Sequence, residues 1–172
     1  MKHKLNIHTP FCLLLFLLQL SSSTFAQSSK KIQALDKANH AIELVDAGKI
    51  EEGIKLLQES EKLDPQNINY PYEIGYAYYS QSKYQHAVNI LQPLLKHHNV
   101  HAKVYQLLGN SYDNLEQGDK ASITYEEGLK KFPKAGNLYL EMGVLYMMKK
   151  DYENALSYYE KGIEVDPSFP SN

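Results

Sequence analysis

The feature that most constrains this chain is one fixed spacing that several residue types share. Three residue types each recur three times at this 34-residue interval: Gly75, Gly109 and Gly143; Ala87, Ala121 and Ala155; Tyr78, Tyr112 and Tyr146. A fixed period of this length is typical of stacked helix pairs, because each pair alone is too small to bury its own apolar face. The sequence therefore predicts an all-α solenoid.

Residues 102–135 illustrate how one repeat forms its helix pair. Three apolar residues of the first helix share one face by their spacing: Leu108, Tyr112 and Leu115. Gly109 lies beside this face, although a glycine inside a helix costs ~1 kcal/mol relative to alanine. We therefore expect the two helix backbones to approach closely at Gly109, with Ala121 as the small residue opposite. Tyr112 and Tyr125 are expected to fill the space on either side.

These positions resemble the tetratricopeptide repeat (TPR), whose pattern runs aromatic, Leu-Gly, Tyr, Ala, aromatic, small residue and Pro. The third unit matches this pattern with Tyr105, Leu108-Gly109, Tyr112, Ala121, Tyr125, Gly128 and Pro133. The fourth unit matches it with Tyr139, Met142-Gly143, Tyr146, Ala155, Tyr159, Gly162 and Pro167. The resemblance implies a right-handed superhelical α-solenoid of about four helix-turn-helix repeats.

The first two units depart further from the pattern. In the second unit, Pro71 holds the aromatic position and Asn99 the terminal proline position, and the first unit is degenerate. The predicted organisation is a signal peptide at 1–26, a linker at 27–33, repeats at 34–67, 68–101, 102–135 and 136–169, and a tail at 170–172.

Residues 1–26 have the composition of a secretory signal. Lys2 and Lys4 precede the apolar run at 11–18, and Thr24 and Ala26 supply the small residues that a signal peptidase reads. We expect cleavage after Ala26 and export to the periplasm or the medium, followed by a loose polar tether and a first helix from Ile32. The alternative is a retained membrane anchor, for which the apolar run is short.

The processed chain would contain 172 − 26 = 146 residues and no cysteine, so disulfide bonds are excluded. Its formal charge follows from 18 − 2 = 16 basic residues against 20 acidic residues, a net charge of −4. All basic residues are lysines, so bidentate recognition of phosphate or guanine is excluded. We therefore expect no nucleic-acid partner.

The strongest candidate for a metal site is the cluster of His97, His98 and His101. No carboxylate or cysteine lies close to it in sequence, whereas structural zinc has four well-spaced ligands. A solvated loop between repeats is the preferred interpretation. The chain also has no nucleophile motif and no phosphate-binding glycine loop, so we expect no enzymatic activity and no cofactor.

In proteins that this chain resembles, the first helix of each pair lines a concave groove for a peptide or partner protein. The equivalent inward positions are Asn69, Tyr72, Tyr76, Tyr79, Lys103, Gln106, Asn110, Asp113, Asn137, Leu140, Val144 and Met147. Only Lys103 and Asn110 could clamp a terminal carboxylate, which disfavours that mode of binding. The alternative is that several of these tyrosines only pack between repeats.

The last predicted helix pair would expose an apolar face at its C-terminal side. Three explanations stay open at this point. The chain is a fragment of a longer array, which we favour, or it pairs end to end with another copy as a structural, self-assembling array, or this last surface binds a partner.

Overall fold

The computed structural model describes residues 9–167, and every regular element within this range is an α-helix. The elements are α1 (Thr9–Asp46), α2 (Ile50–Leu63), α3 (Asn69–Ser80), α4 (Tyr84–Leu94), α5 (Ala102–Asn114), α6 (Gly118–Lys131), α7 (Gly136–Met148) and α8 (Tyr152–Val165). The predicted all-α fold of paired helices is therefore confirmed.

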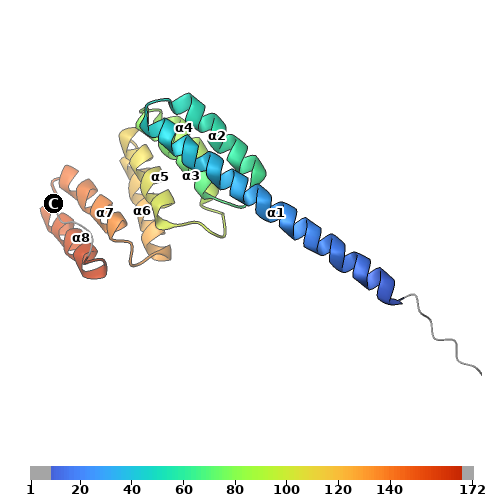
Figure 1. Ribbon diagram of the computed structural model, residues 1–172. Coiled ribbons are helices and arrows are strands. Elements are labelled where there is room, and N and C mark those ends of the chain that lie inside the picture. Colours follow the sequence, from blue (N-terminus) through green and yellow to red (C-terminus); the bar gives the residue numbers. More distant parts are fainter. Residues whose placement is uncertain (1–8, 168–172) are drawn as a thin grey trace, which may run out of the picture.

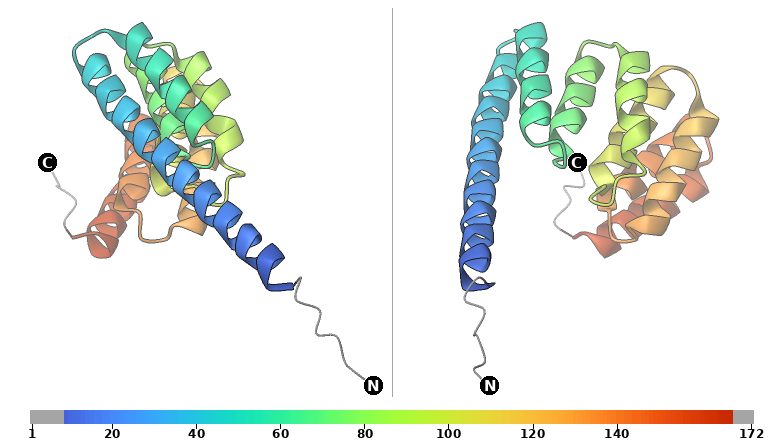
Figure 2. Two further views of the ribbon diagram at one scale, coloured as in Figure 1. Left: turned by 45° about the vertical axis from the view of Figure 1, so that its right-hand side comes forward. Right: turned by 90° about the vertical axis from the view of Figure 1, so that its right-hand side faces the viewer.

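The eight helices form four antiparallel pairs that follow one another in a curved row (Figure 1). Each helix packs most extensively on its pair partner and less extensively on the first helix of the next pair. The first helices α1, α3, α5 and α7 also contact one another in sequence, which places them together on one side of the row. Figure 2 shows this progression from α1 to α8 along the curve.

The turn inside each pair has the same unusual backbone conformation. Its left-handed residue recurs at the 34-residue spacing, with positive φ angles of 79°, 58°, 60° and 60° at Gly48, Ser82, Glu116 and Lys150. A left-handed conformation costs a residue with a Cβ roughly 1–2 kcal/mol, so three of the four turns are strained at this position. The recurrence extends to the first pair, whose sequence departs most from the repeat pattern.

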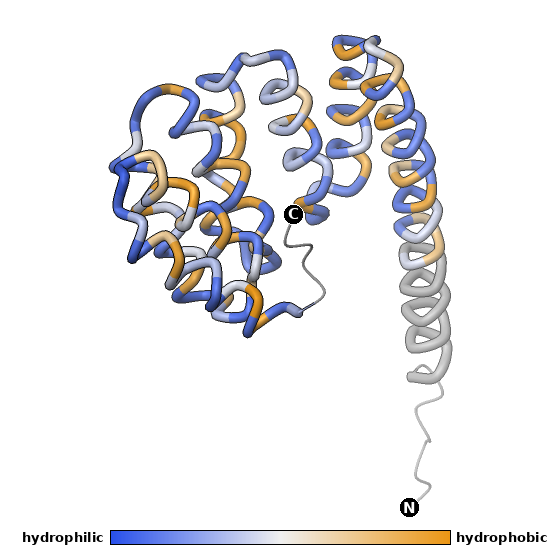
Figure 3. The backbone as a smooth tube through the Cα atoms, turned by 90° about the vertical axis from the view of Figure 1, so that its left-hand side faces the viewer, coloured by the Kyte–Doolittle hydropathy of each residue, from blue (hydrophilic) through white to orange (hydrophobic). Residues whose placement is uncertain are grey.

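The apolar core comprises two groups of buried side chains, and the partly buried Tyr78 packs against both. One joins α1, α2 and α3 around Ala41, Leu57 and Ile74, and the other joins α4 to α7 around Leu91, Leu108 and Leu138. Figure 3 shows apolar and polar positions alternating along the helices of the row. The stack thus stabilises each pair through its neighbours, as expected for a solenoid.

The packing at the recurring glycine differs from our expectation of a close approach between two backbones. A Cβ at Gly109 would overlap the ring of Tyr125, and a Cβ at Gly143 would overlap the ring of Tyr159. In the second pair, a Cβ at Gly75 would lie 2.7 Å from Leu91 Cδ2. The glycine therefore accommodates a large side chain of the second helix, because the space beside that glycine is filled by the side chain and not by backbone.

The expected loose tether at residues 27–31 is wrong, because these residues are helical within α1, as is the rest of the predicted linker at 27–33. The stretch contains no glycine or proline, so nothing in its sequence stops the helix from continuing. All of its side chains are exposed, and the first buried residue of α1 is Ala34. The helix leaves the body of the molecule here (Figure 1).

Part of the predicted signal peptide, residues 1–8, lies outside the described residues, as do the predicted tail at 170–172 and residues 168–169. Within the part of the chain that could be searched, no helix has both the length and the apolar character of a membrane span.

Candidate functional site

A hollow lies between α3, α5 and α7, on the side where the first helices of the pairs meet. Its volume is about 690 Å³, and its lining comprises Asn69, Tyr72, Glu73, His101, Ala102, Lys103, Gln106, Ala135, Gly136, Asn137 and Asp166. Five of the predicted inward residues are among them, namely Asn69, Tyr72, Lys103, Gln106 and Asn137. The structure therefore brings together polar groups from three consecutive repeats.

A ladder of side-chain hydrogen bonds ties α5 to α7 along this hollow. Asn137 Nδ2 donates to Gln106 Oε1 at 2.7 Å, and Gln106 Nε2 donates to Glu141 Oε1 at 2.7 Å. Asn110 Nδ2 donates to the same Glu141 oxygen at 3.3 Å. Tyr125 of α6 completes the ladder by donating its hydroxyl to Asn110 Oδ1 at 2.6 Å. Gln106 and Asn110 therefore hold the helices in register, and each has one amide N–H and one oxygen lone pair not used in the ladder.

Other polar groups in the hollow remain available. No hydrogen bond engages the side chains of Asn69, Glu73 or Lys103 among the described residues. Burial raises the pKa of the Glu73 carboxyl, and the nearby Lys103 ammonium opposes this rise. Burial, together with the charge of Glu73, raises the pKa of the Tyr72 hydroxyl to about 12. The hollow thus offers an ammonium, a carboxylate, an amide and a phenol to a bound molecule.

The histidine cluster separates into two parts. The rings of His97 and His98 stack with their centroids 4.4 Å apart, whereas the His101 ring lies edge-on to Tyr72 at 5.2 Å. Burial lowers the pKa of His101, and Lys103 lowers it further. No group of three potential metal ligands occurs among the described residues. His101 was predicted to lie in a solvated loop, but it forms part of the wall of the hollow.

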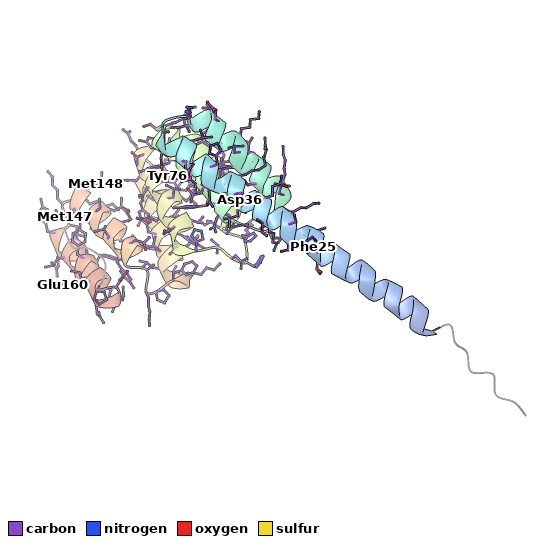
Figure 4. The ribbon with its side chains drawn as sticks, in the orientation of Figure 1. Phe25, Asp36, Tyr76, Met147, Met148 and Glu160 are labelled. Carbon is purple, nitrogen blue, oxygen red and sulfur yellow. The ribbon has the colours of Figure 1, made fainter. Side chains whose placement is uncertain are left out.

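The remaining predicted residues lie outside this hollow. Four of them form exposed apolar surface on the first helices, with exposed fractions of 45% for Tyr76, 36% for Leu140, 38% for Val144 and 44% for Met147. Figure 4 shows Tyr76 and Met147 at separate places along the row. Tyr79 is half-buried and accepts a hydrogen bond from Asn114 Nδ2 at 3.2 Å. Asp113 is also half-buried and does not line the hollow.

Sequence reasoning missed Glu73 and Glu141, two carboxylates of this face. They occupy equivalent positions, two repeat periods apart, and each directly follows a predicted inward residue, Tyr72 or Leu140. Their intermediate repeat equivalent is Leu107, which is buried. This position therefore lies at the border between core and groove, and a wider definition of the inward face would have included it.

Comparisons with known proteins identify the repeat. Residues 136–169 and residues 102–131 each match a family model described as "Tetratricopeptide repeat". Both segments are therefore similar to this repeat. Proteins built from TPR units generally serve as protein-interaction scaffolds and are typically not enzymes. The matched TPR segments contain α5 to α8, which form one side of the hollow and the C-terminal end of the row.

Curated relatives share the repeat over short parts of their length. The chain is 32% identical over 60 residues to "Tetratricopeptide repeat protein 21B" of Mus musculus. This match covers 35% of this chain and 5% of the relative. The chain is also 25% identical over 119 residues to "TPR repeat-containing protein YpiA" of Bacillus subtilis (strain 168). This match covers 69% of this chain and 28% of the relative. The chain thus spans only 5% to 28% of the curated relatives' length.

Solved structures match most of the chain. A crystal structure of MamA has a TM-score of 0.66 and 25% identity, and the match covers 78% of this chain and 79% of MamA. A thermophilic TPR protein of Thermus thermophilus has a TM-score of 0.66 at 15% identity, covering 78% of this chain and 75% of that protein. The similarity to the second structure is one of fold alone.

Proposed function

We propose that this chain is a non-enzymatic scaffold that binds an extended segment of a partner protein along its first helices. The observation that supports this function best is the hollow between α3, α5 and α7, whose volume is about 690 Å³. Its lining includes three polar side chains, Asn69, Glu73 and Lys103, that make no hydrogen bond among the described residues. The two TPR segments add support, since such repeats use curved surfaces for binding.

The chemistry of the hollow favours a peptide as the occupant. Lys103 can donate to carbonyl or carboxylate oxygens of the bound segment, while Asn69 can both donate and accept. The exposed side chains of Tyr76, Leu140 and Val144 would cover apolar residues of the same segment. The ladder around Glu141 holds the α5 and α7 walls in place before binding, which lowers the ordering cost.

The test uses peptides selected from a random displayed library against the purified chain. Binding of a selected peptide is then measured by calorimetry for the unaltered chain, for Tyr72→Ala and for Lys103→Ala. We expect each substitution to weaken binding by about tenfold or more, since central interface side chains often contribute about 1–2 kcal/mol each.

Ile123→Ala is the matched control, because Ile123 is an exposed apolar residue of α6 outside the hollow. Equal affinity of all four proteins for the peptide would refute binding in the hollow. So would a loss of peptide affinity in Ile123→Ala as large as the loss in Tyr72→Ala.

We also propose that the chain is exported and that residues 1–26 are removed. The basic start, apolar run and small residues before Gln27 support this. Intact mass measurement of the protein from its native cells should give a chain beginning at Gln27. A full-length mass recovered from the membrane fraction would favour the alternative, a retained anchor.

A further inference from the structure

The outer face of α8 carries a stripe of exposed apolar side chains. Tyr152, Leu156 and Ile163 are 62%, 58% and 50% exposed, and their spacings of four and seven residues place them on one face of the helix. Three large apolar side chains exposed in one row on a helix of 14 residues are unusual for a surface that faces only water.

The repeat itself indicates what kind of element fits this stripe. The residues equivalent to Leu156 in α2 and α4 are Ile54 and Val88, which are only 4% and 3% exposed. The residues equivalent to Ile163 are Leu95, which directly follows α4, and Leu129 of α6, and both pack against the core. In the earlier pairs, the second helix also packs against the first helix of the next pair. The α8 stripe is therefore shaped for a helix.

A row of acidic side chains borders the stripe. Glu153, Glu160 and Glu164 are exposed and lie beside Tyr152, Leu156 and Ile163 on the helix surface. Figure 4 labels Glu160 on α8. Lys161 is the only cation of this helix, and its Nζ lies 3.0 Å from Glu164 Oε2. A helix that covers the stripe therefore meets net negative charge along one of its edges.

This charge argues against a second copy of the chain as the occupant. In α5 and α7, the position that faces the preceding pair holds Val104 or Leu138, each fully buried, whereas the equivalent residue of α1 is the exposed Asp36. Likewise, Ser111 of α5 and Leu145 of α7 are buried, whereas the equivalent residue of α1 is Glu43, whose side chain is 79% exposed. Stacking α1 of one copy on α8 of another would bring like charges together, and so would pairing α8 with itself.

We propose that the outer face of α8 docks an amphipathic helix of another protein, one that carries lysine or arginine beside its apolar face. The apolar residues of that helix would cover Tyr152, Leu156 and Ile163, and its cations would lie against Glu153 and Glu160. This surface is separate from the hollow between α3, α5 and α7, so the chain would hold two partners or two segments of one partner.

The test measures binding of a synthetic probe to the full chain. The probe is a fluorescein-labelled amphipathic helical peptide about as long as α8, with leucines on one face, lysines beside them and alanine elsewhere. A matched peptide carries glutamate in place of every lysine. Fluorescence anisotropy at low salt should show binding of the lysine peptide and about tenfold or weaker binding of the glutamate peptide.

Two pairs of substitutions locate the site. Leu156→Gln with Ile163→Gln should weaken binding about tenfold or more, and Glu153→Gln with Glu160→Gln should weaken it several-fold and reduce its dependence on salt. The second pair changes only exposed side chains and so tests the site even if the first pair impairs folding. Ile123→Gln alters an equally exposed isoleucine of α6 and should leave binding unchanged.

The outcomes separate the alternatives. The proposal would be overturned if Ile123→Gln weakened binding of the lysine peptide as much as the α8 substitutions do. Equal binding of both peptides, or no binding of the lysine peptide, would also overturn it. In the last case, light scattering that shows self-association, abolished by Leu156→Gln with Ile163→Gln, would assign the face to a second copy. Tyr72→Ala should not affect this probe, so failure of the groove and failure of the α8 site are distinguishable.

Discussion

Gly109 shows how a single missing side chain determines the packing of one repeat. The ring of Tyr125 occupies the space where a Cβ at residue 109 would lie, and Tyr125 is only 2% exposed, so the ring has little room to move. Gly109→Ala should therefore lower the free energy of unfolding by about 1–3 kcal/mol, although alanine favours the helix. Urea denaturation followed by circular dichroism measures this change.

Gly118→Ala is the matched control, since nothing lies within 4 Å of the Cβ that it would add. Its effect should stay within about 0.5 kcal/mol, as is usual for surface substitutions. Equal loss of stability in both variants would contradict the packing argument.

Glu73 provides a prediction about pH. Its pKa is raised in the folded chain by burial, so the folded state binds the proton more tightly than the unfolded state does. The carboxylate therefore opposes folding as pH rises above the usual glutamate range, and this penalty is absent at lower pH. Glu73→Gln should raise the free energy of unfolding at pH 7, and the gain should shrink toward pH 4.

Denaturation at both pH values tests this sign. Glu51 has the opposite shift, since a hydrogen bond from Lys83 lowers its pKa. Glu51→Gln should therefore show no gain at pH 7. A loss of stability in Glu73→Gln at pH 7 would show that Glu73 makes a favourable interaction that outweighs its burial.

At this scale the sequence predicts which positions recur but not what fills the space beside them. The period singled out Gly109, Ala121 and Tyr125, yet the contact of the glycine with the ring depends on the orientation of two helices. Five predicted groove residues do line the hollow, but the engagement of Gln106 and Asn110 in a ladder depends on Glu141, one residue outside the predicted face.

The turns between paired helices are the elements with the clearest stored strain. Glu116 has a φ of 60°, and its equivalent in the first pair, Gly48, adopts a similar angle without a Cβ. Glu116→Gly should raise the free energy of unfolding by about 0.5–1 kcal/mol, because relief of the steric cost outweighs the added freedom of the unfolded chain.

Thermal unfolding measures this gain. Glu127→Gly is a control on the exposed face of α6, where glycine should cost about 1 kcal/mol. Destabilisation by both substitutions would show that the turn at Glu116 is not strained.

Helix boundaries were less predictable than helix existence. Residues 27–31 were expected to be a tether because they are polar, but a polar segment without glycine or proline can continue a helix that is already anchored. Local composition therefore could not place the start of α1, whereas the period placed the paired helices that follow.

On the scale of the whole molecule, local stability should differ from one helix pair to the next along the row. The central pair of α5 and α6 contacts the pairs on both sides, through α5 before it and through both helices after it. In contrast, α8 contacts only its own pair, and the exposed stretch 24–33 of α1 contains no buried residue. In a linear array each pair is stabilised mainly by its neighbours.

Hydrogen exchange followed by mass spectrometry should therefore give a gradient. Amides of α5 and α6 should exchange at least about tenfold more slowly than those of α8, and residues 24–33 should exchange fastest. Equal protection in all four pairs would indicate a single cooperative unit in place of a stepwise array.

The match between the glycine of one helix and the large side chain of its pair partner limits how such a gene can be recombined. The corresponding partners are Ala41 with Leu57 in the first pair and Gly109 with Tyr125 in the third. A crossover that joined α1 to α6 would place the methyl group of Ala41 against a tyrosine ring, whereas a crossover between pairs keeps every match intact. Duplication and exchange should therefore succeed for whole pairs and fail for single helices.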